Sequence, residues 1–435
     1  MQNGTEKVTE MNYYENKSQS EKEALYTALC EEYDRYRDMK LSLDLSRGKP
    51  NAEQLDISEG LLTMPMTKGM CFSQSGIDYR NYGILDGVPE CKRLFADLLS
   101  LDEDNIFVGG NSSLALMYDT LARAMIFGNP DSVRPWCKEE KIKWICVAPG
   151  YDRHFKITED LGFELLTVKM LSDGPDMDEV ERLVTDESVK GIWCVPKYSN
   201  PTGNTYSDEV VRRLASMKCA APDFRIMWDN AYAVHDFDEN GDTLADIFAY
   251  AKEAGNEDRI MYYSSTSKIT FPGSGVAILA ASRRNLDFVK RYTGTQTIGY
   301  DKINQMRHVH YFENADNMYA HMLKLGAKIK KKFDITLEGL GELDGLGIAE
   351  WTRPRGGYFV SLDVLCGSAS RVYELMKGVG VTLTQVGATF PYGRDPEDRN
   401  LRIAPTYPTD SDLALAIKLL TLSVKLSALE TLLKK

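Results

Sequence analysis

Residues 105–281 contain short apolar runs that alternate with longer stretches in which hydrophobic positions recur at helical spacing. The apolar runs are rich in valine, isoleucine and aromatic residues, which is typical of buried strands. The predicted strands lie at residues 106–108, 144–147, 191–195, 225–228, 260–263 and 276–280. Strands that alternate with helices pack as a mostly parallel sheet with helices on both faces. The pattern therefore predicts an α/β fold for this part of the chain.

The hydrophobic pattern differs on both sides of this region. Residues 1–20 are polar and charged, which indicates a disordered or loosely docked arm, and a helical pattern begins at Ser20. After about Leu325, two predicted strands and a closing helix that follows Thr409 indicate a smaller α+β unit. The two strands are expected at residues 359–363 and 399–403. The expected divisions are an N-terminal arm (1–20), a small domain (21–75 with 325–435) and a large domain (76–324).

Polar residues follow several of the predicted strands at the point where each strand ends. They are Ser112, Tyr151, Asn200, Asp229 and Ser265. Open α/β sheets bind their ligands in the crevice at the carboxyl ends of the strands. We therefore expect these side chains to meet in one site.

Three short segments around these positions suit one cofactor. They are Ser199-Asn200-Pro-Thr-Gly203, Asp229-Asn-Ala-Tyr232 and Ser265-Thr-Ser-Lys268. Lysine is the side chain that carries a primary amine, so Lys268 can form a Schiff base with the aldehyde of pyridoxal phosphate. A carboxylate keeps the ring nitrogen of that cofactor protonated, and amide or hydroxyl groups can donate hydrogen bonds to its phenolic oxygen. Hydroxyls and backbone N–H groups at the start of a helix suit its phosphate.

In this order along the chain, the segments resemble those of fold-type I aminotransferases of class I/II, and most closely the divergent aspartate aminotransferase subgroup. The resemblance covers about residues 43–402, and Ser267 to Phe271 reads much like the lysine segment of that subgroup. It implies a large domain with a mixed, mostly parallel sheet flanked by helices, together with a smaller α+β domain.

For the cofactor ring, the resemblance implies a role for each of five residues. Lys268 matches the Schiff-base lysine, and Asp229 matches the residue that contacts the pyridine nitrogen. Tyr232 and Asn200 match the partners of the phenolic oxygen. Tyr151 matches the aromatic residue that stacks on the ring.

For the cofactor phosphate, Ser112 and Ser113 match the turn that surrounds it, and Ser265 matches a hydroxyl that binds it. Tyr82 matches the tyrosine that reaches the phosphate of the neighbouring subunit, so a homodimer with shared sites is expected. The chain departs from the family at Gly275, where an arginine usually pairs with the phosphate. Either another cation replaces that arginine, or the hydroxyls and helix N–H groups suffice.

For the substrate, Arg402 matches the arginine that binds the α-carboxylate, and Gly48 matches the glycine whose backbone faces it, with Asn200 beside them. Arginine suits this task because its planar guanidinium can donate two parallel hydrogen bonds to a carboxylate. The subgroup resemblance favours aspartate and 2-oxoglutarate, whose distal carboxylate needs a second cation. The candidates for that cation are Arg47, Arg80 and Arg307.

The expected activity is transfer of an amino group from an L-amino acid to a 2-oxo acid, with Lys268 moving the α-proton. Two alternatives remain open from the sequence. One is β-elimination or decarboxylation with the same cofactor, because fold does not fix function. The other is a non-catalytic cofactor-binding module of a DNA-binding regulator. That module needs a basic helix-turn-helix segment, for which the first 40 residues are too few and too acidic.

Composition narrows the remaining possibilities. The 435 residues carry a net charge of −12, with a pI of about 5.1, which argues against binding to nucleic acids or anionic membranes. The N-terminal residues contain no apolar targeting segment, and no apolar run is long enough to span a bilayer. The eight cysteines form no Cys-x-x-Cys motif, and His308 and His310 lack companion ligands, so free thiols and no metal site are expected. We expect a cytoplasmic enzyme that acts on small molecules.

Overall fold

The computed structural model describes residues 13–14 and 16–434. The predicted arm at residues 1–20 therefore lies largely outside the described residues. The first helix, α1 (Gln19–Arg37), begins next to the predicted start. Ser18 caps this helix, because its Oγ accepts a hydrogen bond from the N–H of Glu21 while the Glu21 carboxylate accepts one from the N–H of Ser18.

The main sheet has the strand order β2-β9-β8-β7-β6-β3-β4-β5. Its strands are β2 (Ile106–Val108), β3 (Lys143–Ala148), β4 (Glu164–Leu171), β5 (Gly174–Pro175), β6 (Val189–Cys194), β7 (Arg225–Asp229), β8 (Ile260–Ser265) and β9 (Ala277–Ala281). The central strands run parallel from β8 to β4, whereas β9 runs antiparallel to both of its neighbours and β5 runs antiparallel to β4. The prediction of a mostly parallel, mixed sheet is confirmed. All six predicted strands are present, and the sequence pattern did not predict β4 or β5.

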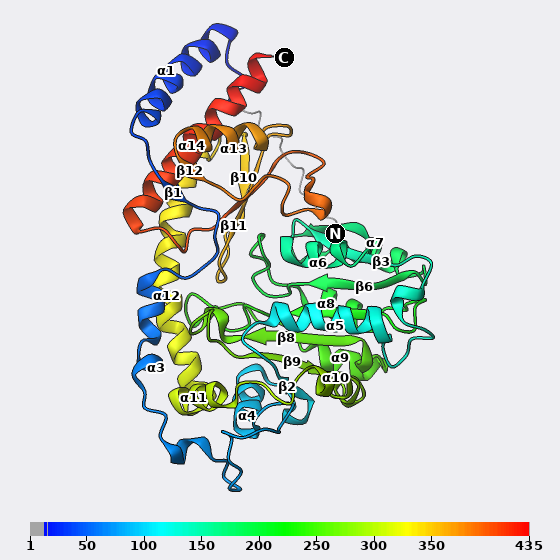
Figure 1. The fold of residues 1–435 in the computed structure, drawn as a ribbon. Helices are drawn as coiled ribbons and strands as arrows, with labels where there is room; N and C mark the ends of the chain where they lie inside the picture. The colour runs from blue at the N-terminus through cyan, green and yellow to red at the C-terminus, as the bar shows by residue number, and fades with distance from the viewer. Residues whose placement is uncertain (1–12, 15, 435) are drawn as a thin grey trace, which may run out of the picture.

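Helices cover both faces of this sheet (Figure 1). They are α4 (Pro89–Leu99), α5 (Ser113–Phe127), α6 (Asp152–Asp160), α7 (Met177–Leu183), α8 (Asp208–Ser216), α9 (Ile247–Ala254) and α10 (Arg283–Gln296). Successive side chains of a strand point to opposite faces, so neighbouring residues enter different cores. Trp193 and Met227 belong to the core shared with α5 and α6. Ile192 and Trp228 belong to the core shared with α7 and α8, so the sheet is buried on both sides.

The second unit contains a small antiparallel sheet of order β10-β11-β13 and a parallel pair of β1 with β12. Its strands are β1 (Leu43–Asp44), β10 (Ala349–Trp351), β11 (Val360–Val364), β12 (Val381–Thr382) and β13 (Asn400–Ile403). Its other elements are α1, α13 (Ala369–Gly378) and α14 (Asp410–Leu433), with the short helices α2 (Ala52–Leu55) and α3 (Gly60–Thr63) between the units. The two strands expected in this region are present as β11 and β13. Thr409 caps α14 by accepting a hydrogen bond from the N–H of Asp412.

Helix α12 (Ala315–Leu340) joins the two units. It begins before the expected boundary near residue 325 and continues past it. In Figure 1 one end of α12 lies beside α11 (Lys302–Phe312), and the other end lies beside α14. Between these ends, the helix passes directly against the loop that contains Asp236, because a Cβ atom at Gly326 would collide with the Asp236 carbonyl. Only glycine allows this close approach.

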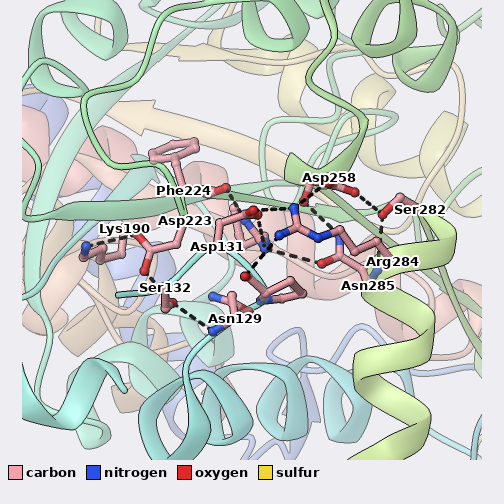
Figure 2. Close-up of polar contacts among 12 residues, drawn as sticks. Asn129, Asp131, Ser132, Lys190, Asp223, Phe224, Asp258, Ser282, Arg284 and Asn285 are labelled. Atoms are coloured by element: carbon pink, nitrogen blue, oxygen red, sulfur yellow. Dashed lines mark hydrogen bonds and ion pairs between the residues drawn. The ribbon is translucent and has the colours of Figure 1, made fainter. Parts of the chain in front are cut away.

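Figure 2 shows a network of charged and polar side chains, several of them buried, that includes residues at the amino ends of β6 and β7. Oδ1 of Asp223 accepts a hydrogen bond from Nζ of Lys190 at 3.0 Å, and Oδ2 accepts one from Oγ of Ser132 at 2.6 Å. Nη2 of the buried Arg225 lies 3.3 Å from Oδ2 of Asp131. These contacts fix the loop after α5 to the starts of β6 and β7.

The structure also bears on membrane, metal and disulfide chemistry. Among the described helices, none combines the length and the apolar character needed to cross a membrane. Residues 13–14 and 16–434 contain no group of three or more His, Cys, Asp or Glu side chains placed to hold a metal ion. The eight cysteines are all free thiols.

Candidate active site

A cavity of about 350 Å³ lies at the carboxyl ends of β6, β7 and β8. Every predicted site residue except Tyr82 lines it. These residues are Gly48, Ser112, Ser113, Tyr151, Asn200, Asp229, Tyr232, Ser265, Lys268 and Arg402. A larger cavity, of about 710 Å³, lies between β4 and the second unit and is lined by none of them. The smaller cavity is the candidate active site, because it brings together a lysine, a buried carboxylate and an arginine.

Asp229 is the last residue of β7, and its carboxylate is almost fully buried. Its Oδ2 lies 3.0 Å from Nε2 of His154, whose imidazole stacks on Trp193 with ring centroids 4.3 Å apart. Its Oδ1 is buried and has no hydrogen-bond partner among the described residues. A buried carboxylate oxygen without a donor is costly, so this atom fits a protonated nitrogen brought by a ligand.

Lys268 ends a short 3₁₀ helix, η6 (Thr266–Lys268), that follows β8 directly. Its Nζ lies 5.2 Å from the ring centroid of Tyr232 and 5.7 Å from that of Tyr358. Burial among these rings lowers the pKa of Lys268, and the negative charge of Asp229 opposes part of that effect. A lowered pKa increases the fraction of lysine in the neutral amine form, which is the nucleophilic and basic form.

Two tyrosines enclose the lysine and the carboxylate. Burial raises the pKa of Tyr232 well above its ordinary value, so its hydroxyl keeps a proton to donate. Burial also raises the pKa of Tyr151 to about 12, with a further contribution from Asp152. The ring of Tyr151 meets the His154 ring edge to face, with centroids 4.9 Å apart. Both tyrosines line the cavity.

The start of α5 forms another wall of the cavity. Ser112 is the residue before the helix and Ser113 is its first residue, and neither hydroxyl bonds to another residue that the structure describes. Oγ of Ser265 donates to Oγ of Ser267 at 3.1 Å on the facing turn. Free N–H groups at a helix start, with hydroxyls beside them, suit an anion such as phosphate.

Gly275, where the family usually has an arginine, lies against this wall. A Cβ atom there would be 3.0 Å from Oγ1 of Thr266 and 3.3 Å from the backbone nitrogen of Ser267. A side chain at this position therefore fits only if these neighbours shift by a few tenths of an ångström. This supports an anion site built from hydroxyls and backbone N–H groups.

Arg402 reaches the cavity from β13 of the second unit, and only 9% of its side chain is exposed. Its Nη1 lies 2.8 Å from Oδ1 of Asp152 and 3.4 Å from Oδ1 of Asn200. Its guanidinium carbon lies 5.1 Å from the ring centroid of Phe359, which also packs so closely on Gly48 that a Cβ atom at position 48 would collide with it. Asp152, Asn200 and the Phe359 ring thus hold the guanidinium at the cavity.

Sequence reasoning missed three charged or titratable residues of the site, which are Asp152, Arg153 and His154. All three follow Tyr151 at the start of α6, where the helix reaches the cavity. Their adjacency to a predicted site residue was the available signal. Asp152 and Arg153 line the cavity itself, and His154 lies behind Asp229.

The three arginines proposed for a distal carboxylate lie in different places. Arg47 lines the cavity, with its Nε 3.7 Å from Oδ2 of Asp44. Arg80 pairs with Asp78 through two nitrogens, at 2.8 and 2.5 Å, and does not line the cavity. Arg307 belongs to α11 and does not line it either.

Tyr82 is the predicted site residue that the cavity of its own chain does not include. Its side chain is 83% exposed. It lies on a loop whose neighbour Gly83 approaches Gly299 closely, with the carbonyl oxygen 2.9 Å from a Cβ atom built there. The structure of one chain leaves its predicted contact with a second subunit untested.

The fold and the chain's similarity to known proteins define an aminotransferase. The chain belongs to the aspartate aminotransferase family, since the family model described as aspartate amino-transferase matches residues 17–435. The expected fold and enzyme class are thereby confirmed.

The chain is similar to known proteins over nearly all of its length. An aspartate aminotransferase of Corynebacterium glutamicum is 47% identical over 92% of both chains. A crystal structure of an aspartate transaminase from that species has a TM-score of 0.94 at 44% identity, covering 96% of this chain and 99% of the other. The α-aminoadipate aminotransferase LysN of Thermus thermophilus, solved with N-(5'-phosphopyridoxyl)-L-leucine, shares the fold with a TM-score of 0.72 at 21% identity, covering 90% and 93% of the two chains.

Proposed function

We propose that this chain is a pyridoxal 5'-phosphate-dependent aminotransferase that moves the amino group of L-aspartate to 2-oxoglutarate. One observation carries the proposal: Lys268 and Asp229 line the same cavity, and Oδ1 of Asp229 has no hydrogen-bond partner among the described residues. The first supplies an amine of lowered pKa, and the second supplies a buried acceptor. The aspartate aminotransferase of C. glutamicum, at 47% identity, supports the choice of substrate.

The residues of the cavity fit the cofactor. Nζ of Lys268 would hold its aldehyde carbon, and Oδ1 of Asp229 would accept a hydrogen bond from its ring nitrogen. Tyr232 and the side-chain nitrogen of Asn200 would donate to its phenolic oxygen, because Oδ1 of Asn200 already accepts from Arg402. When bound, pyridoxal phosphate takes up the electrons of a bond broken at the substrate's α-carbon.

The phosphate would lie at the start of α5. Ser112, Ser113 and Ser265 would donate their hydroxyls, and the first N–H groups of the helix would add the positive end of its dipole. In this assignment, hydroxyls and backbone N–H groups bind the phosphate, and the arginine usually found at the position of Gly275 is not needed.

The chain's own groups can position the substrate and move its proton. Arg402 would bind the α-carboxylate, with Asn200 and the backbone of Gly48 beside it. Nζ of Lys268, freed from the cofactor, would take the α-proton as a general base and would return it at the cofactor's former aldehyde carbon, on the other side of the amino nitrogen. Burial that lowers the pKa of Lys268 favours the neutral amine that this step requires.

A dicarboxylic substrate needs a second cation, and we assign that role to Arg153. This exposed arginine lines the cavity and makes no ion pair with any residue in the described part of the chain. Arg47 is the second cation at the cavity mouth, but its guanidinium already lies near Asp44. A free guanidinium is better placed to take up an incoming carboxylate than one with a partner.

The proposal includes a cytoplasmic homodimer in which Tyr82 of one chain reaches the phosphate of the other. The 83% exposure of Tyr82 and the 58% exposure of Ile298 support a partner surface there, since exposed large apolar side chains mark interfaces and the two loops meet where Gly83 approaches Gly299. Light scattering of the purified protein would give its mass, and a monomer would contradict this part of the proposal.

The test is an absorption spectrum of the protein with pyridoxal phosphate, recorded before and after addition of L-aspartate and then 2-oxoglutarate. We expect a visible band that aspartate removes and 2-oxoglutarate restores, with oxaloacetate and glutamate as products. Lys268→Ala should lose the band. Lys169→Ala, which changes an exposed lysine outside the cavity, should keep it.

Other outcomes would change the assignment. A wild-type protein without a visible band would overturn the cofactor assignment. A band that aspartate leaves unchanged would overturn the substrate. Pyruvate and ammonia released from L-serine, which has a leaving group on its β-carbon, without a 2-oxo acid would indicate β-elimination, and carbon dioxide released from L-aspartate would indicate decarboxylation.

A further inference from the structure

Asp152 holds the arginine that the proposed function assigns to the substrate's α-carboxylate. Its Oδ1 lies 2.8 Å from Nη1 of Arg402, and 33% of the Asp152 side chain is exposed. The two residues come from different parts of the fold, because Asp152 begins α6 and Arg402 lies on β13. Both line the active-site cavity.

The hydrogen bonds of Arg402 determine which of its nitrogens an incoming carboxylate can use. Nη1 also contacts Oδ1 of Asn200 at 3.4 Å, and Nε contacts Oγ1 of Thr384 at 3.4 Å. Nη2 has no partner among the described residues. A carboxylate that binds two neighbouring nitrogens of a guanidinium must use Nη2 together with either Nη1 or Nε.

Each of these arrangements brings the carboxylate into conflict with Asp152. If the substrate uses Nη1, it has to displace Oδ1 of Asp152 or share that nitrogen with it after displacing Oδ1 of Asn200. If it uses Nε, two carboxylates share one guanidinium and repel each other. In both cases, the negative charge of Asp152 opposes the binding of the substrate's negative charge.

We propose that Asp152 is a positioning residue that sets the affinity of the site for α-carboxylates by competing for Arg402. The inference rests on the proposed function, since it takes Arg402 as the ligand of the α-carboxylate. Every amino acid and every 2-oxo acid that enters the site carries that group. Asp152 therefore weakens the binding of all of them by a similar factor.

The same contact gives Arg402 a partner when no substrate is bound. An arginine with 9% exposure and no partner is destabilising, because a buried charge loses its hydration. Asp152 supplies the missing charge as a product leaves. A transamination needs this exchange twice per cycle, because one acid must leave before the next one enters.

The test compares wild type with Asp152→Asn in steady-state kinetics with L-aspartate and 2-oxoglutarate. Asparagine keeps the size of the side chain and an oxygen that can accept from Nη1, but it removes the charge. We expect the KM values of both substrates to fall by a similar factor, roughly threefold to tenfold, as for a partly exposed charge pair. The change in KM should exceed the change in kcat.

Two further variants separate competition from a merely structural role. Asp152→Glu keeps the charge and should keep KM closer to wild type than Asp152→Asn does. In an Arg402→Ala background, Asp152→Asn should no longer lower KM, because the competition has lost its target. Unchanged or raised KM values in Asp152→Asn would overturn the inference, and raised values would show that Asp152 orients Arg402 instead.

A binding measurement keeps this inference separate from the proposed substrate. Calorimetry with maleate, an unreactive dicarboxylate, reports carboxylate affinity of the purified enzyme whichever amino acid it converts. We expect maleate to bind Asp152→Asn more tightly than wild type. Equal or weaker binding would overturn the role of Asp152, whereas tighter binding by an enzyme inactive on aspartate would overturn only the substrate assignment.

Discussion

Nε2 of His154 lies 3.0 Å from Oδ2 of Asp229, and the imidazole lies flat on Trp193. Both members of this pair are buried, with 1% and 6% of their side chains exposed. The contact occupies one oxygen of the carboxylate and leaves Oδ1 without a partner among the described residues. His154 therefore fixes which oxygen Asp229 offers to the cavity.

Replacing His154 by phenylalanine keeps a ring on Trp193 but removes the hydrogen bond to Asp229. We expect kcat/KM to fall about tenfold to a hundredfold, because hydrogen bonds to charged groups contribute roughly 1.5–3 kcal/mol. The measurement is steady-state kinetics, together with the wavelength of the cofactor band. His310→Phe is the control, since His310 bonds to the Met70 carbonyl outside the cavity. Equal effects of the two changes would contradict a specific role for His154.

Lys268 should make the stability of the cofactor-free protein depend on pH. Burial lowers the pKa of Lys268 in the folded state, whereas the unfolded chain keeps a value near 10.4. Between these two values the unfolded chain binds more protons, so the free energy of unfolding rises with pH. Lys268→Met removes the charge at similar length and should be more stable than wild type at neutral pH.

The measurement is urea unfolding of cofactor-free wild type and Lys268→Met across a range of pH. The difference between them should shrink as the pH approaches about 10. A difference that stays constant with pH would mean that the ionisation of Lys268 is not its cause.

Arg153 should matter for acidic substrates and much less for neutral ones. We expect Arg153→Gln to raise the KM for L-aspartate about tenfold, through the loss of one charge-assisted hydrogen bond, and to change the KM for L-alanine little. The matched variants are Arg47→Gln, at the same cavity mouth, and Arg80→Gln, outside the cavity of its own chain. A larger effect of Arg80→Gln would point to a cation from the partner subunit instead.

Asp223 should stabilise the fold without affecting catalysis. Burial by itself raises the pKa of Asp223, but hydrogen bonds from Ser132, Trp136 and Lys190 outweigh it and lower the pKa. The resulting stabilisation is present above about pH 4 and is lost as the pH falls through the lowered folded value. Asp223→Asn leaves the charge of Lys190 buried without a counterion, which costs about 3–5 kcal/mol.

Urea unfolding at neutral pH measures this loss, and the activity per folded molecule should stay near that of wild type. The network lies at the amino ends of β6 and β7, and Ser132, Lys190, Asp223 and Arg225 do not line the cavity. Asp178→Asn is the control, because Asp178 is 89% exposed in its pair with Arg213 and should contribute little. Equal losses in the two variants would contradict the importance of burial.

Much of the fold and site could be predicted because local pattern and position coincide. Asp229 and Ser265 end buried parallel strands, and Asn200 follows another, so one edge of the sheet brings them together. Lys268 follows one of these strands within a single short helix. These positions depend on the order of the strands and helices along the chain and on the parallel direction of the strands. Both can be predicted from the sequence pattern.

The remaining features depend on packing that local pattern does not describe. Helix α6 turns Asp152 and Arg153 toward the cavity and His154 toward Asp229, and that rotation is set by contacts with distant strands. Strand β4 was missed because it lies near the edge of the sheet, where buried and exposed residues mix along its length. The space available for a side chain at position 275 depends on how closely Thr266 and Ser267 pack there, which the glycine in the sequence does not indicate.

The course of α12 has a mechanical consequence for the site. Lys268 follows a strand of the main sheet and Arg402 lies on the small antiparallel sheet, and this 26-residue helix contacts elements of both units without a proline to bend it. At Gly326 the helix presses on the backbone at Asp236 with no side chain between them. A side chain at position 326 would push the helix away from that backbone, so we expect a substitution there to change the distance between Nζ of Lys268 and the Arg402 guanidinium, although Gly326 contacts neither residue.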